Sequence, residues 1–165
     1  MTGEDAVRLR PPRNAVDRRA VAWWRTRCLV ATAAPAAVLV LLGALVGPAR
    51  AWLPAAALVA AAGLAGTAFL PLWWFRVHRW EVTDEAVYVR TGALWQEWRI
   101  APLSRIQTVD TVRGPLEQLF RLGTVTVTTA SSKGALRIEG LDHELAAALG
   151  ERLTSLTQAT PGDAT

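Results

Sequence analysis

Hydrophobic residues run without interruption through two stretches of the chain and alternate with polar residues after them. The first stretch, 28–46, has nineteen residues and no charged side chain, and the second, 52–75, is also uncharged. At 1.5 Å per residue, a helix over the first stretch is about 28 Å long, close to the hydrocarbon thickness of a bilayer. About five residues separate the runs, which leaves room only for a tight turn. The pattern predicts a transmembrane helical hairpin over 28–75.

Two other interpretations of the apolar runs are open. Alanine-rich helices can be buried in a large helical core, but the chain has too little other helix to surround two segments that are apolar on all sides. The triplet Ala49-Arg50-Ala51 resembles a signal-peptidase site, and cleavage there would leave one span and reverse the topology. The first run is long for a signal sequence and a second run follows at once, so we favour the uncleaved hairpin.

After residue 75 the hydrophobic period changes to two, which is typical of β-strands. The segment 113–123 interrupts the alternation and predicts a short irregular or helical connection. Val125, Val127, Leu136 and Ile138 are expected to point inward. Four residue pairs are expected to share a strand face: Val87 and Val89, Trp98 and Ile100, Val125 and Val127, and Leu136 and Ile138.

The last segment predicts an amphipathic helix with Asp142 as its N-cap. Residues 157–165 are expected to be a disordered tail. Residues 76–156 are therefore predicted to form an all-β domain of about seven antiparallel strands, capped by a C-terminal α-helix. Leucines recur at every fourth position and predict the buried stripe of that helix: Leu141, Leu145, Leu149 and Leu153.

The positive charge of the chain is concentrated before the first apolar run. Residues 1–27 hold seven arginines and three acids, a net charge of +4, whereas residues 76–165 have a net charge of −1. A near-neutral C-terminal half argues against a nucleic-acid-binding domain there. We interpret 1–27 as a basic N-terminal arm that is attracted to anionic lipids on the cytoplasmic face.

The residues that flank the apolar runs predict the topology. Arginines gather before the first run and after the second, and only Arg50 lies between them. Positive residues stay on the cytoplasmic side, so both termini are expected to be cytoplasmic. The 17 arginines against one lysine, with abundant alanine, indicate a GC-rich bacterial genome. We therefore expect the protein to lie in the inner membrane of a bacterium. Arginines and belt tryptophans are the predicted membrane-interface anchors: Trp23, Trp24, Arg25, Arg27, Trp52, Trp73, Trp74, Arg76 and Arg79.

Residues that carry chemistry are few in this sequence. The single cysteine, Cys28, excludes an internal disulfide and a cysteine-cluster metal site. Neither His78 nor His143 has a second ligand at metal-binding spacing. No GxGxxG, P-loop or GxSxG motif occurs, and neither apolar run contains the acidic or histidine residue that a transporter usually needs. We expect no catalytic residue, no metal, no cofactor and no small-molecule substrate.

Three segments of the second half resemble a known family. PLSRIQTVD (102–110), GPLEQLFRLGTV (114–125) and GLDHE (140–144) are similar to the bacterial pleckstrin-homology (PH) domain of YdbS-like membrane proteins. The resemblance spans 76–155, and such proteins commonly carry a helical hairpin before the domain. It implies a strongly bent, seven-stranded antiparallel sheet capped by a helix, and a partner that is a larger membrane protein with several PH-like domains. It does not imply an enzyme.

Eukaryotic relatives of this fold often bind phosphoinositides through a basic cluster between early strands. The corresponding segment here, RTGALWQEWR (90–99), has two arginines, one glutamate and no lysine, so inositide binding is not expected. Leu94 and Trp95 in this segment suit contact with a protein or a membrane. Arg105 and Arg113 are candidates for binding lipid head groups or an acidic partner.

Those two arginines also have a structural interpretation. Arg105 would form an ion pair with Asp110 or Glu117, and Arg113 would donate to loop carbonyls.

The sequence as a whole predicts a membrane-anchored, non-catalytic binding or assembly module that engages another membrane protein. Free edge strands or the loop at 94–98 would form the contact. A module that senses lipid head groups through Arg105 and Arg113 is one alternative. A small accessory subunit of an export or envelope-stress complex is another.

Overall fold

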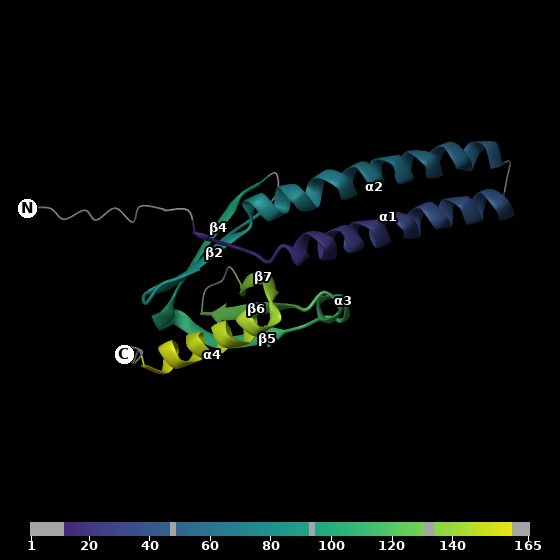
Figure 1. The fold of residues 1–165 in the computed structure, drawn as a ribbon. Helices are drawn as coiled ribbons and strands as arrows, with labels where there is room; N and C mark the ends of the chain where they lie inside the picture. Colours follow the sequence, from purple (N-terminus) through teal and green to yellow (C-terminus); the bar gives the residue numbers. More distant parts are fainter. Residues whose placement is uncertain (1–11, 47–48, 93–94, 131–133, 160–165) are drawn as a thin grey trace, which may run out of the picture.

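Two long helices form a hairpin that extends away from a β domain in the computed structural model of the protein (Figure 1). The structure describes residues 12–46, 49–92, 95–130 and 134–159. Helix α1 spans Arg19–Leu45 and helix α2 spans Ala49–Val77. In their most apolar windows only 6% and 11% of the residues are buried, as lipid-facing helices require. The predicted transmembrane hairpin is confirmed.

The two helices of the hairpin approach each other closely at small residues. A Cβ atom placed on Gly63 of α2 would lie 1.9 Å from the Thr32 Cγ2 atom of α1. Near the distal turn, a Cβ on Gly43 would lie 3.0 Å from Trp52 Cβ. Membrane helices associate through such small residues because lipid supplies no hydrophobic drive for helix contact.

The region before the first apolar run is part of the domain. Asn14–Ala15 form strand β1, which pairs antiparallel with strand β2, Arg79–Val82, from beyond the hairpin. Helix α1 begins at Arg19, so 19–27 are helical as well. The basic arm predicted over 1–27 is therefore folded from β1 onward, and 1–11 lie outside the described residues.

The described residues hold seven strands in two antiparallel sheets, ordered β1-β2-β3-β4 and β5-β6-β7, which confirms the predicted β domain. Six of these strands follow the hairpin, and the seventh, β1, precedes it. The connection predicted at 113–123 contains a short helix, α3. The remaining elements are β3 (Ala86–Thr91), β4 (Glu97–Pro102), the 3₁₀ turn η1 (Leu103–Arg105), β5 (Ile106–Val112), α3 (Pro115–Leu119), β6 (Leu122–Thr129), β7 (Leu136–Asp142) and α4 (His143–Ala159).

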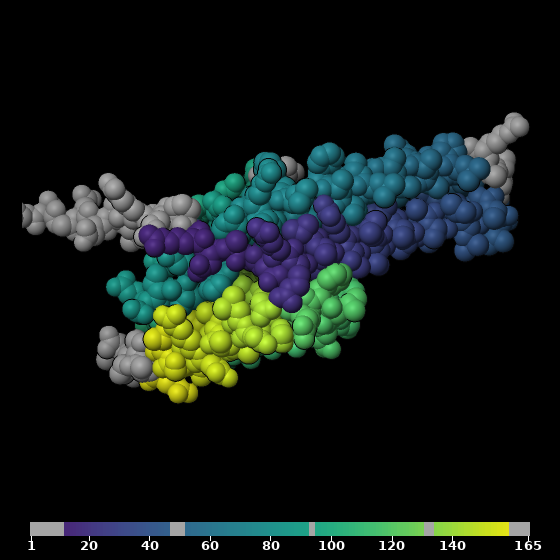
Figure 2. Space-filling model, viewed as in Figure 1, coloured from purple at the N-terminus to yellow at the C-terminus, as the bar shows by residue number. Residues whose placement is uncertain are grey.

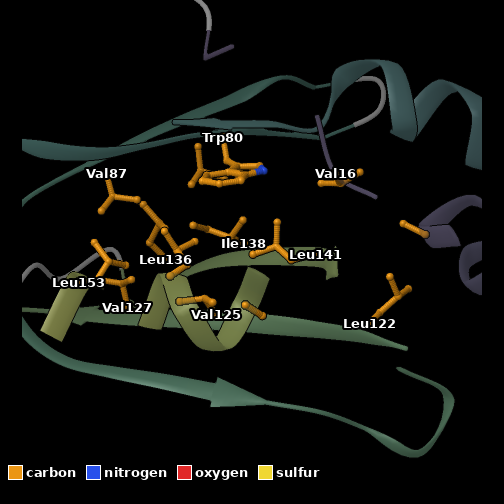
Figure 3. Close-up of a cluster of buried hydrophobic side chains, with 14 of the residues drawn as sticks. Val16, Trp80, Val87, Leu122, Val125, Val127, Leu136, Ile138, Leu141 and Leu153 are labelled. Atoms are coloured by element: carbon orange, nitrogen blue, oxygen red, sulfur yellow. The ribbon is translucent and has the colours of Figure 1, made fainter. Parts of the chain in front are cut away.

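The core lies between the two sheets and under α4 (Figure 3). Trp80 and Val87 enter it from the first sheet. The four side chains predicted to point inward are buried, which confirms that part of the strand pattern: Val125, Val127, Leu136 and Ile138. Alternation along β4 places the Ala101 side chain in the core opposite Val87. Trp98 and Ile100 are on the other face of the strand and point outward.

Helix α4 buries a different set of residues from the predicted leucine stripe. Ala146, Leu149 and Leu153 face the core, whereas Leu145 is exposed and Leu141 belongs to β7. A helix turns every 3.6 residues, so a stripe with a constant spacing of four drifts off the buried face.

The start of α4 is set by a local feature. Asp142 caps its start as predicted, because Asp142 Oδ1 accepts from the Glu144 amide at 2.9 Å. The helix continues to Ala159, so the tail predicted at 157–165 is helical over its first three residues, and 160–165 lie outside the described residues.

Candidate functional site

One face of β4 presents large apolar side chains to the exterior. Trp98 and Ile100 share the outward face, as predicted, and are 36% and 40% exposed. Trp95, just before the strand, is 88% exposed. We call Trp95, Trp98 and Ile100 the β4 surface. The predicted contact residue Leu94 lies outside the described residues.

The β4 surface lies on an edge strand. Within the part of the chain that the structure describes, β3 is the only strand that pairs with β4. Arg90 of β3 stands opposite Trp98, with its Cζ atom 5.5 Å from the centre of the indole ring, and its Nε donates to the Val77 carbonyl at 3.0 Å. The surface therefore lies beside the last turn of α2.

The two candidate arginines of the second sheet do not form one site. Arg105 ends η1 and Arg113 follows β5, so the seven-residue strand between them separates their Cα atoms by roughly 25 Å. Arg113 Nε donates to the Leu122 carbonyl at 3.0 Å, which is the structural role anticipated for it.

Arg105 forms neither of the ion pairs anticipated for it. Among the described residues it has no ion pair or hydrogen bond. Glu117, one of its expected partners, is buried and occupied: Oε2 accepts from the Gly114 amide at 2.7 Å, and Oε1 accepts from the Thr124 hydroxyl at 2.6 Å. This carboxylate holds α3 against β6.

Trp23 and Trp24 lie in the domain core, where they are only 5% and 4% exposed. The Trp24 ring packs edge-on against Trp74 of α2 at 5.9 Å and lies 5.1 Å from the His78 ring. This location differs from the prediction that both indoles face the lipid-water boundary. The reason is that the start of α1 packs on β7 and carries the two side chains into the protein. Trp73 of α2, in contrast, is exposed.

Cations surround the base of the hairpin. Arg25 and Arg76 are exposed. Arg27 lies with its Cζ atom 5.0 Å from the Trp23 ring centre, and Arg79 donates to the Phe75 carbonyl at 2.8 Å. Trp52, the remaining predicted anchor, is half-buried at the distal end of the hairpin.

A cavity of about 370 Å³ lies where α1, α2 and β7 meet. His78 in its wall bonds through Nδ1 to the Trp74 carbonyl at 2.9 Å, and burial lowers the pKa of His78 below its usual value. His78 and Glu139 lie far apart in the sequence, and no local pattern indicates that they share a cavity. Residues of all three elements line it, among them Trp24, Arg27, Ala31, Trp74, His78 and Glu139.

A group of charged residues ties the start of α1 to the end of β7. Arg19 Nε donates to Asp17 Oδ1 at 2.9 Å, and its Nη2 donates to Asp142. The hydrogen bonds from Arg19 lower the pKa of both carboxyl groups. The Asp17 amide also donates to the Gly140 carbonyl at 2.8 Å. Figure 2 shows the result: the start of α1 (purple) lies against the end of β7 and the start of α4 (yellow-green).

Among the described residues no group of three His, Cys, Asp or Glu side chains is placed to hold a metal ion. The arrangement offers exposed surfaces and cavities for binding.

Comparison with known proteins agrees with this architecture. A family profile for the bacterial PH domain matches residues 28–157, from the apolar part of α1 to α4. The UPF0699 transmembrane protein YdbS of Bacillus subtilis (strain 168) is 32% identical over 88 residues, which is 53% of this chain and 54% of that protein. The chain thus spans about half the length of that relative, and no solved structure matches it. With its two transmembrane helices and its two-sheet domain, the protein belongs to the bacterial PH domain family, as a YdbS-like membrane protein.

Proposed function

We propose that the protein is a non-catalytic assembly module that engages a second membrane protein through the β4 surface. The observation that carries the proposal is the combination of an edge strand with three exposed apolar side chains, Trp95, Trp98 and Ile100. Solvent-exposed protein surfaces rarely carry large apolar side chains in one contiguous patch unless the patch contacts a partner.

An edge strand can pair with a strand of another chain. The backbone N–H and C=O groups on the outer side of β4 supply affinity, and pockets for alternate side chains supply specificity. Tryptophan is enriched among the residues that dominate binding energy at interfaces. A partner with an edge strand of its own, such as another PH-like domain, fits this geometry.

The membrane position of the surface restricts the partner. Arg25, Arg27, Arg76 and Arg79 surround the base of the hairpin, and positive residues favour the cytoplasmic side. We infer that the domain and both termini lie on the cytoplasmic face of a bacterial inner membrane. The β4 surface lies beside the last turn of α2. A partner anchored in the same membrane is therefore held at a high effective concentration near this surface and loses little translational entropy on binding.

Lipid sensing through Arg105 and Arg113 has weaker support. The two arginines lie at opposite ends of β5, and Arg113 already uses its Nε on the Leu122 carbonyl. A single head group does not bridge roughly 25 Å of strand.

The proposal is tested with a photo-crosslinking amino acid at position 95 of the full chain, expressed in bacterial cells. We expect an adduct with a membrane protein. The same probe at Glu151, an exposed residue of α4, serves as control and is expected to give no such adduct. Introducing Trp98→Glu should weaken the position-95 adduct several-fold, because a charge then enters the apolar contact.

Other adducts contradict the proposal in distinguishable ways. A lipid adduct at position 95 would favour head-group sensing. An adduct with a processing or export enzyme would favour the accessory-subunit alternative. An equal protein adduct from positions 95 and 151 would mean that the β4 surface has no special role.

A further inference from the structure

The cavity at the helix-domain junction has one side in the membrane and one side in the domain. Cys28 and Ala31 line it from the apolar run of α1, and Ala31 is exposed. His78 lines it from just beyond α2, and Glu139 lines it from β7. A volume of about 370 Å³ is at the lower end of the range for small-molecule sites, so it suits a head group but not a whole lipid.

Two opposite charges in this cavity are not paired with each other. Arg27 stacks on Trp23, and in the described residues its guanidinium has no carboxylate or carbonyl partner. The Glu139 side chain is half-buried and, across the same residues, makes no hydrogen bond or ion pair, although its charge acts on the His78 ring. A partly buried carboxylate without a partner is costly, and a ligand that brings a cation would relieve that cost.

The neutral form of His78 adds an acceptor to the same wall. Its Nδ1 lies 2.9 Å from the Trp74 carbonyl oxygen, which can only accept, so Nδ1 carries the proton. Nε2 is then left with a lone pair. Burial lowers the pKa of His78 and outweighs the nearby Glu139 carboxylate, which raises it, so the ring stays neutral near pH 7 and keeps that acceptor.

We propose that the junction cavity binds the phosphoethanolamine head group of a membrane phospholipid. Arg27 donates to the phosphate. Glu139 and His78 Nε2 accept from the primary ammonium group. The glycerol and acyl portions leave the cavity past Ala31 and Trp74 into the bilayer.

Charge and shape separate this ligand from other phospholipids. An anionic head group without an amine would leave Glu139 unpaired and near a phosphate of the same sign. A choline head group carries a cation, but its three methyl groups remove the N–H donors that Glu139 and His78 require. The cavity therefore selects a zwitterion with a primary amine, and charge-assisted hydrogen bonds supply the preference.

The test measures which lipids the full chain retains. The protein is purified in detergent, exchanged into equal mixtures of phosphatidylethanolamine, phosphatidylcholine and phosphatidylglycerol, and analysed by native mass spectrometry. We expect one retained phosphatidylethanolamine, favoured about tenfold over phosphatidylcholine, which corresponds to one charge-assisted hydrogen bond. Equal retention of the three lipids would overturn the proposal.

Matched variants assign the effect to the cavity. Glu139→Gln, nearly isosteric, should reduce the preference over phosphatidylcholine several-fold, because the ammonium group loses its charged partner while His78 Nε2 still accepts, and Arg27→Gln should reduce retention of every lipid. The exposed Glu144→Gln and Arg18→Gln are charge-matched controls that should retain the wild-type preference. An unchanged preference in Glu139→Gln, at an unchanged melting temperature, would contradict the assignment.

A competition arm distinguishes a lipid from a soluble ligand. Free phosphoethanolamine carries the same charges but lacks the acyl chains that would lie along Ala31, so it should displace the retained lipid only weakly. Displacement at equal concentrations would contradict a membrane source for the ligand. These readouts are independent of crosslinking at Trp95, so the site can fail without affecting the proposed function, and the reverse also holds.

Discussion

The guanidinium group of Arg19 contacts the carboxylate of Asp142, which lies 123 residues later in the chain. Arg19 begins α1, and Asp142 ends β7 and caps α4. The same guanidinium holds Asp17, whose amide donates to the Gly140 carbonyl. We call Asp17, Arg19 and Asp142 the Arg19 clasp. It joins the first residues of the hairpin to the last strand of the domain.

Replacing Arg19 with methionine should loosen this connection. The clasp is partly exposed, so we expect a loss of about 1 kcal/mol in the free energy of unfolding. Chemical denaturation of the full chain in detergent measures it. Arg18→Met, an exposed neighbour, is the control. Equal stability of the two variants would mean that the clasp contributes nothing.

The clasp also predicts a dependence of stability on pH. Arg19 lowers the pKa of Asp17 and Asp142 below the ordinary aspartate value of 3.8. A carboxyl with a lowered pKa stabilises the fold fully above its unfolded-state pKa, and this stabilisation is lost as the pH falls through the folded-state pKa. Melting temperatures should therefore drop below about pH 4, and the drop should be smaller in Arg19→Met. A drop of equal size in both proteins would refute this origin.

Gly140 permits the contact between β7 and α1 for two reasons. Its φ is +74°, and a Cβ there would lie 2.8 Å from Ala20 Cβ. Gly140→Ala should cost about 2–4 kcal/mol, from backbone strain plus overpacking. Gly134 has the same φ with no atom within 4 Å, so Gly134→Ala should show the backbone part alone, about 1 kcal/mol. Unfolding of both variants in detergent measures the difference, and equal losses would mean that Ala20 does not press on this position.

The hairpin should depend on Gly63 more than on Gly66. A Cβ on Gly63 would overlap the Thr32 side chain, whereas the nearest atom to a Cβ on Gly66 is 3.5 Å away. Gly63→Ala is therefore expected to separate the two helices and cost about 1–3 kcal/mol. Gly66→Ala should be neutral or stabilising by up to about 1 kcal/mol, because alanine favours helix. Thermal unfolding followed by circular dichroism in detergent compares them; a larger loss in Gly66→Ala would contradict the packing of α1 on α2.

Some features could be predicted because they depend on neighbouring residues only. An uncharged run such as 28–46 suits lipid wherever it lies in the fold, since composition and length decide whether a helix can span a bilayer. The alternation of Val125 and Val127 defines a strand face in the same local way. Asp142 caps α4 through amides two and three residues away.

Other features depended on pairings between distant segments. Trp23 and Trp24 looked like interface anchors because the sequence cannot tell that β1 pairs with β2 across the whole hairpin. Glu117 was a plausible partner for Arg105 until α3 directed its carboxylate to Gly114 and Thr124. Leu145 fitted a leucine stripe, but the way α4 packs on the sheet buries Ala146 and leaves Leu145 exposed.

The sequence by itself therefore determined the two membrane spans, the alternating strands and the closing helix, because hydrophobic period and capping act over one or two turns of chain. Only the tertiary structure decided that the start of α1 packs into the domain, that Trp98 and Ile100 face outward on an edge, and that Arg27, His78 and Glu139 line one cavity. Those outcomes depend on which apolar surfaces pack against each other and are removed from water. Residues that lie 50 or more positions apart produce no local sequence pattern that would predict such a contact.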